Sequence, residues 1–235
     1  MVTLDIGGKK YDVPTEWKDI TLNYWLGWYE VIKKHEQICQ ASMKEGQEFD
    51  KENPLSNLSD IQIMNLNVAI FKYITKLDEE TIKKIDVDSI LNAMSFIAKL
   101  TEDYKPKGVD GFIYEEKKYF FPKEAMYNNT FGDYIESTHL DSTIKMMKHG
   151  RFDVLPEQMA ILCREAGEEY DDDIIPEKTD KFKELTMDIV WEFSFFLTMQ
   201  SIRLTRTFQM FLGKTEEEVE EAKIKFLQLD STTSL

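Results

Sequence analysis

The chain has 235 residues, of which 42% are hydrophobic and 12% aromatic, so it can build a sizeable core and long disorder is excluded for most of its length. Its formal net charge is -15 at a sequence pI of about 4.7, and such a field argues against nucleic acid and anionic membranes as partners. Its two isolated cysteines, Cys39 and Cys163, exclude a disulfide framework and indicate buried thiols in a reducing compartment.

Residues 2–13 are predicted to form a β-hairpin. The segment from Val2 to Ile6 alternates apolar and polar residues, Gly7-Gly8 offers a tight turn, and the chain then returns. Pro14 is expected to end the second strand, because proline cannot donate a hydrogen bond to the ladder.

An aromatic-rich helix is predicted from Leu22 towards Cys39, where apolar residues recur at helical spacing. Aromatic side chains usually pack in cores, but a surplus also indicates a contact surface. Both interpretations stay open here, and we take Trp25 and Trp28 as candidate partner-binding residues. The whole cluster comprises Trp17, Tyr24, Trp25, Trp28 and Tyr29.

Shorter helices are expected to follow a polar loop at 46–54. Ser59 or Asp60 is a suitable N-cap for the first of them, and Asp78 is a suitable N-cap for the second. The apolar residues of these helices fall in three runs, at 63–74, 82–85 and 90–100.

A domain boundary is predicted at 105–108, where Pro106 and Gly108 break helical structure. The expected domains are 1–104 and 109–235, with one continuous domain as the open alternative. A second hairpin is predicted directly after this boundary, with Glu115-Glu116 as a turn that lacks glycine.

The two predicted hairpins share a short motif in which Lys-Lys-Tyr is followed, three positions after the tyrosine, by proline. We interpret this repeated motif as the mark of two hairpins of similar build, each of which presents an edge strand to a partner. Tyr11 and Tyr119 are therefore candidate partner-binding residues. The two copies run from Lys9-Lys10-Tyr11 to Pro14 and from Lys117-Lys118-Tyr119 to Pro122.

Two helices are predicted in the next part of the chain. Thr130 and Asp133 resemble a capping box that opens a helix, and Leu155-Pro156 is expected to start another, with proline in the first turn. An acidic loop is expected at 170–176. Near the end of the sequence, Thr215 is expected to open a last helix through a full capping box with Glu218, and the tail follows it.

A long helix, apolar on most of its circumference, is predicted from about Asp180 to Leu212. Charged residues interrupt it, so a membrane-spanning role is disfavoured and burial within the chain or against a partner is expected. Its candidate partner-binding residues are Trp191, Phe195 and Phe196. The predicted fold class is α+β, predominantly α-helical, with two short hairpins each followed by helices.

The sequence offers no recognisable catalytic motif. Gly7-Gly8 is a turn without a following helix N-terminus, and the histidines His35, His139 and His149 are scattered. We therefore predict no cofactor, no metal and no enzymatic activity. The acidic run at 168–173 leaves a small metal-dependent enzyme as an alternative, although such runs are usually solvated.

Four segments of the second half of the chain form a recognisable series: FGDYIE at 131–136, LPEQMAILCR at 155–164, GEEYD at 167–171 and WEFSFF at 191–196. In these segments the chain resembles small proteins of tailed bacteriophages that act in tail and baseplate assembly. The resemblance implies a non-enzymatic protein of virion assembly, either an assembly chaperone or a structural component, located in the virion or the host cytoplasm. It implies other phage proteins or a second copy as partners. An acidic phage inhibitor of a host protein is a further alternative.

Overall fold

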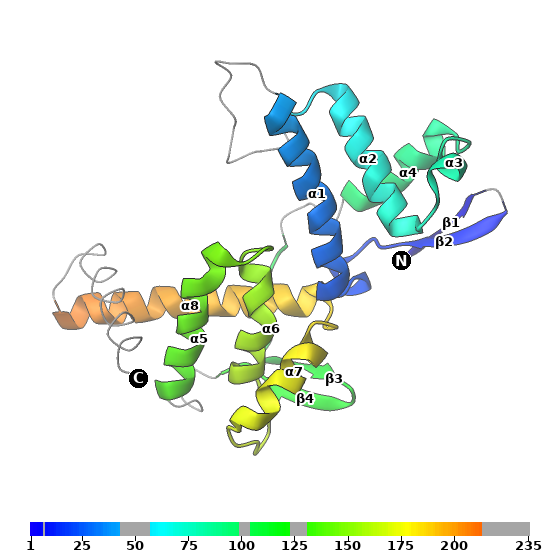
Figure 1. Cartoon of the computed structure of the whole chain (residues 1–235). Helices are drawn as coiled ribbons and strands as arrows, with labels where there is room; N and C mark the ends of the chain where they lie inside the picture. The colour runs from blue at the N-terminus through cyan, green and yellow to red at the C-terminus, as the bar shows by residue number, and fades with distance from the viewer. Residues whose placement is uncertain (7, 43–56, 99–103, 123–130, 213–235) are drawn as a thin grey trace. The chain divides into compact units, whose positions relative to one another are not determined.

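The computed structural model describes residues 1–6, 8–42, 57–98, 104–122 and 131–212, which are mostly helical (Figure 1). Two small antiparallel sheets complete these ranges, so the α+β class is confirmed. The chain divides into two compact units. Unit 1 comprises Met1–Tyr104 with Thr186–Asp188, and unit 2 comprises Lys105–Leu185 with Ile189–Leu235.

Unit 1 begins with the predicted hairpin. Strand β1 (Val2–Ile6) pairs antiparallel with β2 (Lys9–Val13), and Leu4 lies opposite Tyr11. Gly8 has a φ of 79°, a left-handed conformation that glycine adopts without strain, and its N–H donates to the Asp5 carboxylate at 3.0 Å. Glycine at this turn is thus required by its backbone conformation.

The helices of unit 1 are α1 (Leu22–Ser42), α2 (Asp60–Thr75), α3 (Glu79–Ile82) and α4 (Val87–Ala98), with the short η1 (Trp17–Asp19) ahead of them. The predicted caps are confirmed. The Ser59 side chain accepts from the Gln62 N–H and caps α2, and Asp78 accepts from the Thr81 N–H at 2.9 Å and caps α3. The predicted loop at 46–54 lies outside the described residues.

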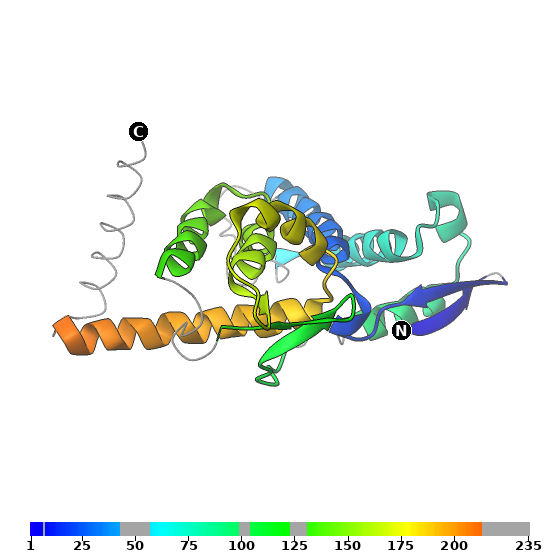
Figure 2. The same cartoon turned by 90° about the horizontal axis from the view of Figure 1, so that it is seen from below.

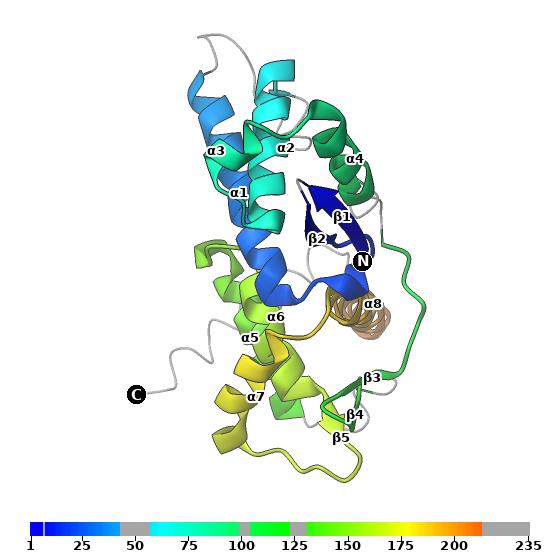
Figure 3. The ribbon, with the colours of Figure 1, turned by 90° about the vertical axis from the view of Figure 1, so that its right-hand side faces the viewer.

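Helices α1 and α2 pack side by side, as Figure 3 also shows. The two helices are closely packed at Gly27, where a Cβ atom would lie 2.3 Å from the Tyr73 hydroxyl. That hydroxyl donates to the Tyr24 carbonyl at 2.9 Å, so it is held in place. Behind it, a core cluster of Phe71, Ile82 and Ala93 joins α2 to α3 and α4.

Unit 2 contains a three-stranded antiparallel sheet in the order β3 (Gly111–Tyr114), β4 (Lys117–Phe120) and β5 (Arg164–Glu165). The predicted second hairpin is confirmed, whereas the sequence did not predict β5. Glu115 and Glu116 have φ values of 48° and 66°, so two glutamates occupy the left-handed positions of a two-residue turn. The antiparallel pairing of β3 with β4, the two strands that flank the turn, holds it in this strained conformation.

The helices of unit 2 are α5 (Phe131–Thr143), α6 (Arg151–Leu162), α7 (Ile175–Phe182) and α8 (Met187–Leu212), of which the first residues of α8 belong to unit 1. Two short helices, η5 (Ile144–Met146) and η6 (Asp172–Ile174), precede α6 and α7. The C-terminal part of α8 extends beyond α5 and α6 in both Figure 1 and Figure 2.

The prediction that Leu155-Pro156 starts a helix is wrong, because α6 begins at Arg151 and Pro156 lies inside it. Gly150, with a φ of 61°, occupies the N-cap, and Asp153 accepts from the His149 N–H at 2.7 Å. Gly150 and Asp153 therefore mark the start of α6, about one turn before the position that the proline suggested. Asp133 lies in α5, while Thr130, its predicted capping partner, lies outside the described residues.

The predicted helix from Asp180 to Leu212 is two helices, since α7 ends at Phe182 and α8 begins at Met187. Within unit 1, the Met187 N–H donates to the Ile20 carbonyl at 2.9 Å, and Thr186 forms a β-bridge with Thr21. These contacts are with residues distant in sequence, and no proline or glycine marks the break.

The expectation of one long helix that is apolar on most of its circumference is also wrong. Within α8, Thr198 and Ser201 are exposed, and Glu192 and Gln200 are buried polar residues. Across the ranges that the structure describes, no helix is both long and apolar enough to span a membrane. The predicted last helix and the tail after it lie outside the described residues.

Candidate functional site

The seven candidate partner-binding residues do not form one surface. Tyr11, Trp25 and Trp28 belong to unit 1, whereas the other four belong to unit 2. The residues of unit 2 are Tyr119 on β4 and Trp191, Phe195 and Phe196 on α8.

Two of these residues are buried, which corrects their proposed role. Trp28 is 1% exposed and meets Trp25 edge to face at 5.5 Å, so it belongs to the core of unit 1. Tyr119 is 8% exposed and stacks on Phe112 at 5.3 Å, on the inner face of its sheet. Burial leaves neither ring available to a partner.

Tyr11 and Trp25 are half-buried. Trp25 lies 5.3 Å from Trp17 in an edge-to-face arrangement and 6.4 Å from Tyr29, so much of its ring surface contacts other aromatic rings of unit 1. Partner binding by these two residues stays a prediction.

Helix α8 has an inner face that packs within unit 2. Val190 and Phe193 are completely buried there, and Phe196 is half-buried. The ring of Phe121, just after β4, lies 5.7 Å from the rings of both Phe193 and Phe196. Trp191 is also half-buried and meets Phe152 of α6 edge to face at 5.6 Å. Trp191 and Phe196 therefore serve packing at least in part.

The opposite side of α8 exposes three apolar residues, Phe195, Met199 and Ile202, which we call the outer stripe. They are 36%, 50% and 40% exposed, respectively. Their spacing of four and then three residues places them on one face of the helix. Of the three, the sequence predicted Phe195 alone; the same spacing could have identified Met199 and Ile202, but the dense apolar residues of the inner face concealed it.

Glu192, a charged residue within the aromatic helix α8, has a structural role. Its side chain is buried, and its two oxygens accept from the backbone N–H groups of Lys107 at 2.6 Å and Gly108 at 3.1 Å. Gly108 has a left-handed φ of 70°. The carboxylate thus fixes the irregular segment that leads into β3.

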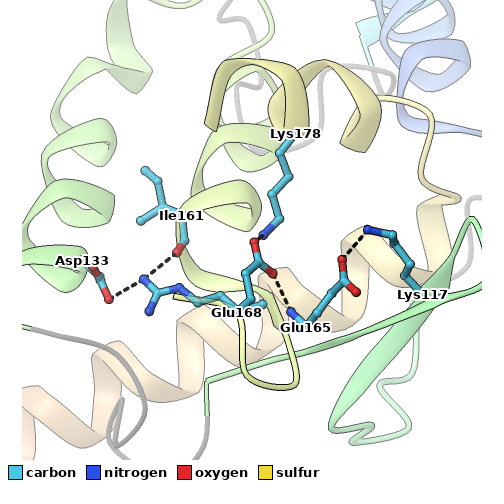
Figure 4. Close-up of polar contacts among 7 residues, drawn as sticks. Lys117, Asp133, Ile161, Glu165, Glu168 and Lys178 are labelled. Carbon is cyan, nitrogen blue, oxygen red and sulfur yellow. Dashed lines mark hydrogen bonds and ion pairs between the residues drawn. The ribbon is translucent and has the colours of Figure 1, made fainter. Parts of the chain in front are cut away.

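The acidic run at 168–173 contributes to a network of internal contacts (Figure 4). Glu168 accepts from Lys178 Nζ at 2.6 Å through one oxygen and from the Glu165 N–H at 2.6 Å through the other. Glu165 in turn pairs with Lys117 of β4 at 2.7 Å. The network joins α7, β5 and β4, so it positions the loop.

A third ion pair in Figure 4 joins α5 to β5. Arg164 donates to the Asp133 carboxylate at 2.7 Å and to the Ile161 carbonyl at 3.4 Å. The Asp133 side chain is 2% exposed and that of Arg164 is 15% exposed. Nearby, Gln158 donates to the Ser137 carbonyl and the Asp141 carboxylate, both at 2.9 Å.

The remaining acids of the loop also have local roles. Asp171 accepts from the Asp173 N–H at 3.0 Å and caps η6, and Tyr170 donates to Glu136 at 2.5 Å. Within the described part of the chain, no group of three or more His, Cys, Asp or Glu residues is arranged to hold a metal ion. The loop therefore lends no support to the metal-dependent alternative.

Cys163 is completely buried, as expected, and burial raises the pKa of its thiol. A thiol kept protonated is a poor nucleophile. The position of this side chain is that of a core residue between α6 and β5.

Comparison with protein-family models, with curated proteins and with solved structures finds no match to this chain. The function is therefore argued from the residues themselves.

Proposed function

We propose that this is a non-enzymatic binding protein that docks onto other protein chains through the outer stripe of α8. The observation that carries the proposal is the exposure of Phe195, Met199 and Ile202 as successive members of one helical stripe. Single exposed apolar residues are ordinary, whereas a contiguous apolar stripe edged by polar residues is typical of a surface that another chain covers. Thr198 and Ser201 supply such an edge.

Other exposed apolar side chains lie at the starts of two helices of unit 1. Ile61, Ile63 and Met64 are exposed on α2, and Val87 and Leu91 are exposed on α4. The outer stripe of α8 spans residues 195–202, about two turns of the helix, whereas the exposed residues of α2 span 61–64, about one turn.

The use of charged side chains in unit 2 favours binding over catalysis. Asp133, Glu168 and Glu192 each make short contacts with a neighbouring cation or backbone N–H group. Carboxylates used in this way hold the scaffold in place. A scaffold with fixed loops and an exposed helix face suits docking.

We propose virion assembly in a tailed bacteriophage as the setting, on the resemblance of the second half of the chain. In this role the protein binds other phage proteins or a second copy, either as an assembly chaperone or as a structural component. Neither role calls for a cofactor, nucleic acid or a membrane.

Quantitative mass spectrometry of purified virions tests the setting and separates the two roles. Many copies per particle identify a structural component. Absence from the particle, together with tail-less particles when the gene is deleted, identifies a chaperone. Normal virions that lack the protein, from a deletion strain with unchanged yield, contradict the proposal.

A further inference from the structure

The outer stripe of α8 continues into a positively charged end. Arg206 follows Ile202 by four residues, so it is the next member of the stripe, and Arg203 lies beside it; both arginine side chains are exposed. Residues 193–212 contain these two arginines and no acidic residue, whereas the chain as a whole has a net charge of -15. A surface that complements the stripe is therefore apolar, with acidic residues at one end.

The outer stripe of a second copy does not offer such a surface. If two stripes packed antiparallel about Met199, Arg203 would lie level with Phe195 of the other copy and Arg206 with Glu192. The Glu192 carboxylate is buried and accepts from the Lys107 N–H at 2.6 Å, so it is already engaged. Charge complementarity thus disfavours a symmetric contact of α8 with itself.

The start of α4, in unit 1, has the required composition. Val87 and Leu91 are each 54% exposed and lie four residues apart, on one face of the helix. Asp86 and Asp88 are exposed beside them, and residues 78–88 contain five acidic residues and two lysines. This face is therefore apolar with a negatively charged end, which is the complement of the outer stripe.

The spacings of the two faces agree when the helices are antiparallel. With Leu91 opposite Met199, Val87 lies about 6 Å further along α4 and Ile202 about 4.5 Å further along α8, so the two apolar pairs overlap. The acidic start of α4 then lies level with residues 202–204, within one helical turn of both arginines. One arrangement thus satisfies the apolar and the charged contacts together.

We infer that the outer stripe of α8 in one copy of the chain docks onto the start of α4 in a second copy. Because the two faces differ, the contact is heterologous: each copy offers its other face to a further copy, and copies add head to tail. The inference rests on the proposed function, since it names the partner of the same outer stripe.

Sedimentation velocity of the purified full chain, over a wide range of concentrations, tests this inference. Met199→Asp with Ile202→Asp removes the face on α8, and Val87→Lys with Leu91→Lys removes the face on α4. We expect the average mass of the unaltered chain to rise with concentration and each variant alone to stay monomeric. An equimolar mixture of the two variants should form a dimer and nothing larger, because it holds one intact pair of faces.

The matched control is Ile61→Lys with Met64→Lys, at a pair on α2 that is 74% and 55% exposed. This variant should associate as the unaltered chain does. Arg206→Glu should weaken the association several-fold, and Asp88→Arg in the same chain should restore it, because the two charges are then exchanged. Both charge substitutions are at exposed positions, so they test the contact without altering a core.

A chain that stays monomeric at every concentration overturns the inference. Association that persists in the Val87→Lys, Leu91→Lys variant also overturns it, because the outer stripe then pairs with a surface other than α4. A mixture of the two variants that stays monomeric does the same. A monomer in solution leaves the outer stripe available to other phage proteins, so failure of the proposed function would show separately in the virion experiment.

Discussion

Unit 1 and unit 2 differ in the polar groups that they bury. Thr75 is the buried polar residue found in the described part of unit 1, whereas unit 2 buries Asp133, Ser137, Gln158, Lys178, Glu192 and Gln200. The lysine pairs of unit 1, such as Lys83 with Glu79, are exposed. Unit 1 is held by aromatic and aliphatic packing with exposed caps, and unit 2 adds buried charges that fix its loops.

The difference shows what each unit needs to keep in place. The hairpin and helices of unit 1 satisfy their backbone groups locally, through turns and caps. Unit 2 contains irregular segments, at 105–110 and 163–171, whose backbone groups need partners from elsewhere. Glu192 and Glu168 supply these acceptors for Lys107, Gly108 and Glu165. Four predictions test this contrast, from the largest effect to the smallest.

Arg164→Met is expected to lower the free energy of unfolding of unit 2 by about 3–5 kcal/mol, because it leaves the Asp133 carboxylate buried without its cation. Urea denaturation followed by circular dichroism measures this. Adding Asp133→Leu should recover most of the loss, since the charge is then removed. Lys83→Met, at an exposed pair of unit 1, serves as the control and should have no measurable effect. A mild effect of Arg164→Met would contradict the role given to the buried pair.

Gly27→Ala is expected to destabilise unit 1 by about 1–3 kcal/mol, because the new methyl group meets the fixed Tyr73 hydroxyl. Thermal unfolding is a suitable measurement. Tyr73→Phe in the same chain should relieve part of the cost by removing the hydroxyl. If the single Gly27→Ala variant is as stable as the unaltered chain, close packing of α1 on α2 is not what this glycine serves.

Glu192→Gln is expected to destabilise unit 2 by about 1 kcal/mol, because a charged acceptor binds backbone N–H groups more strongly than a neutral amide does. Hydrogen exchange at the Lys107 and Gly108 amides should accelerate at the same time. Glu169→Gln, at an exposed position of the acidic run, is the matched control. Unchanged exchange at both amides would argue against the contact.

The smallest expected effect concerns two tyrosines in alkaline solution. Burial raises the pKa of Tyr24 in unit 1, with a contribution from Tyr73. Burial also raises the pKa of Tyr170 in unit 2, with contributions from hydrogen bonds to Asp172 and Glu136. A phenol whose pKa is raised by folding stabilises the fold below the unfolded pKa of about 10, and this contribution is lost as the pH rises through the folded value.

Salt should separate the two tyrosines, because it screens charges but not burial. High salt is expected to lower the pKa of Tyr170 and to leave that of Tyr24 nearly unchanged. Ultraviolet titration of the unaltered chain, with Tyr170→Phe and Tyr24→Phe to assign each step, measures both. An equal response of the two groups would remove this distinction between the units.

Local features of the fold could be predicted from the sequence. Gly8, Ser59 and Asp78 act on neighbours within a few residues, so the first hairpin and the starts of α2 and α3 follow from short patterns. The second hairpin also follows, although its turn needs two glutamates in a left-handed conformation. In this turn, the pairing of β3 with β4 outweighs the preference of glutamate for other backbone conformations.

Contacts between residues distant in sequence could not be predicted. The two-residue strand β5, the pairing of Asp133 with Arg164, and the bond from Lys107 to Glu192 join positions that no spacing rule relates. The break before Met187 likewise depends on Ile20 and Thr21. At the candidate site, the sequence identified the aromatic residues but not their exposure. Trp28 and Tyr119 are buried, whereas Phe195 is exposed.

We propose that the outer stripe of α8 docks onto another chain during virion assembly. Complementation of a deletion phage with Met199→Asp, Ile202→Asp protein, compared with Thr198→Asp protein, tests this proposal, with circular dichroism confirming that both fold. We expect a severe loss of infectious particles for the stripe variant and normal yield for Thr198→Asp. Normal yield from the folded stripe variant would overturn the proposal.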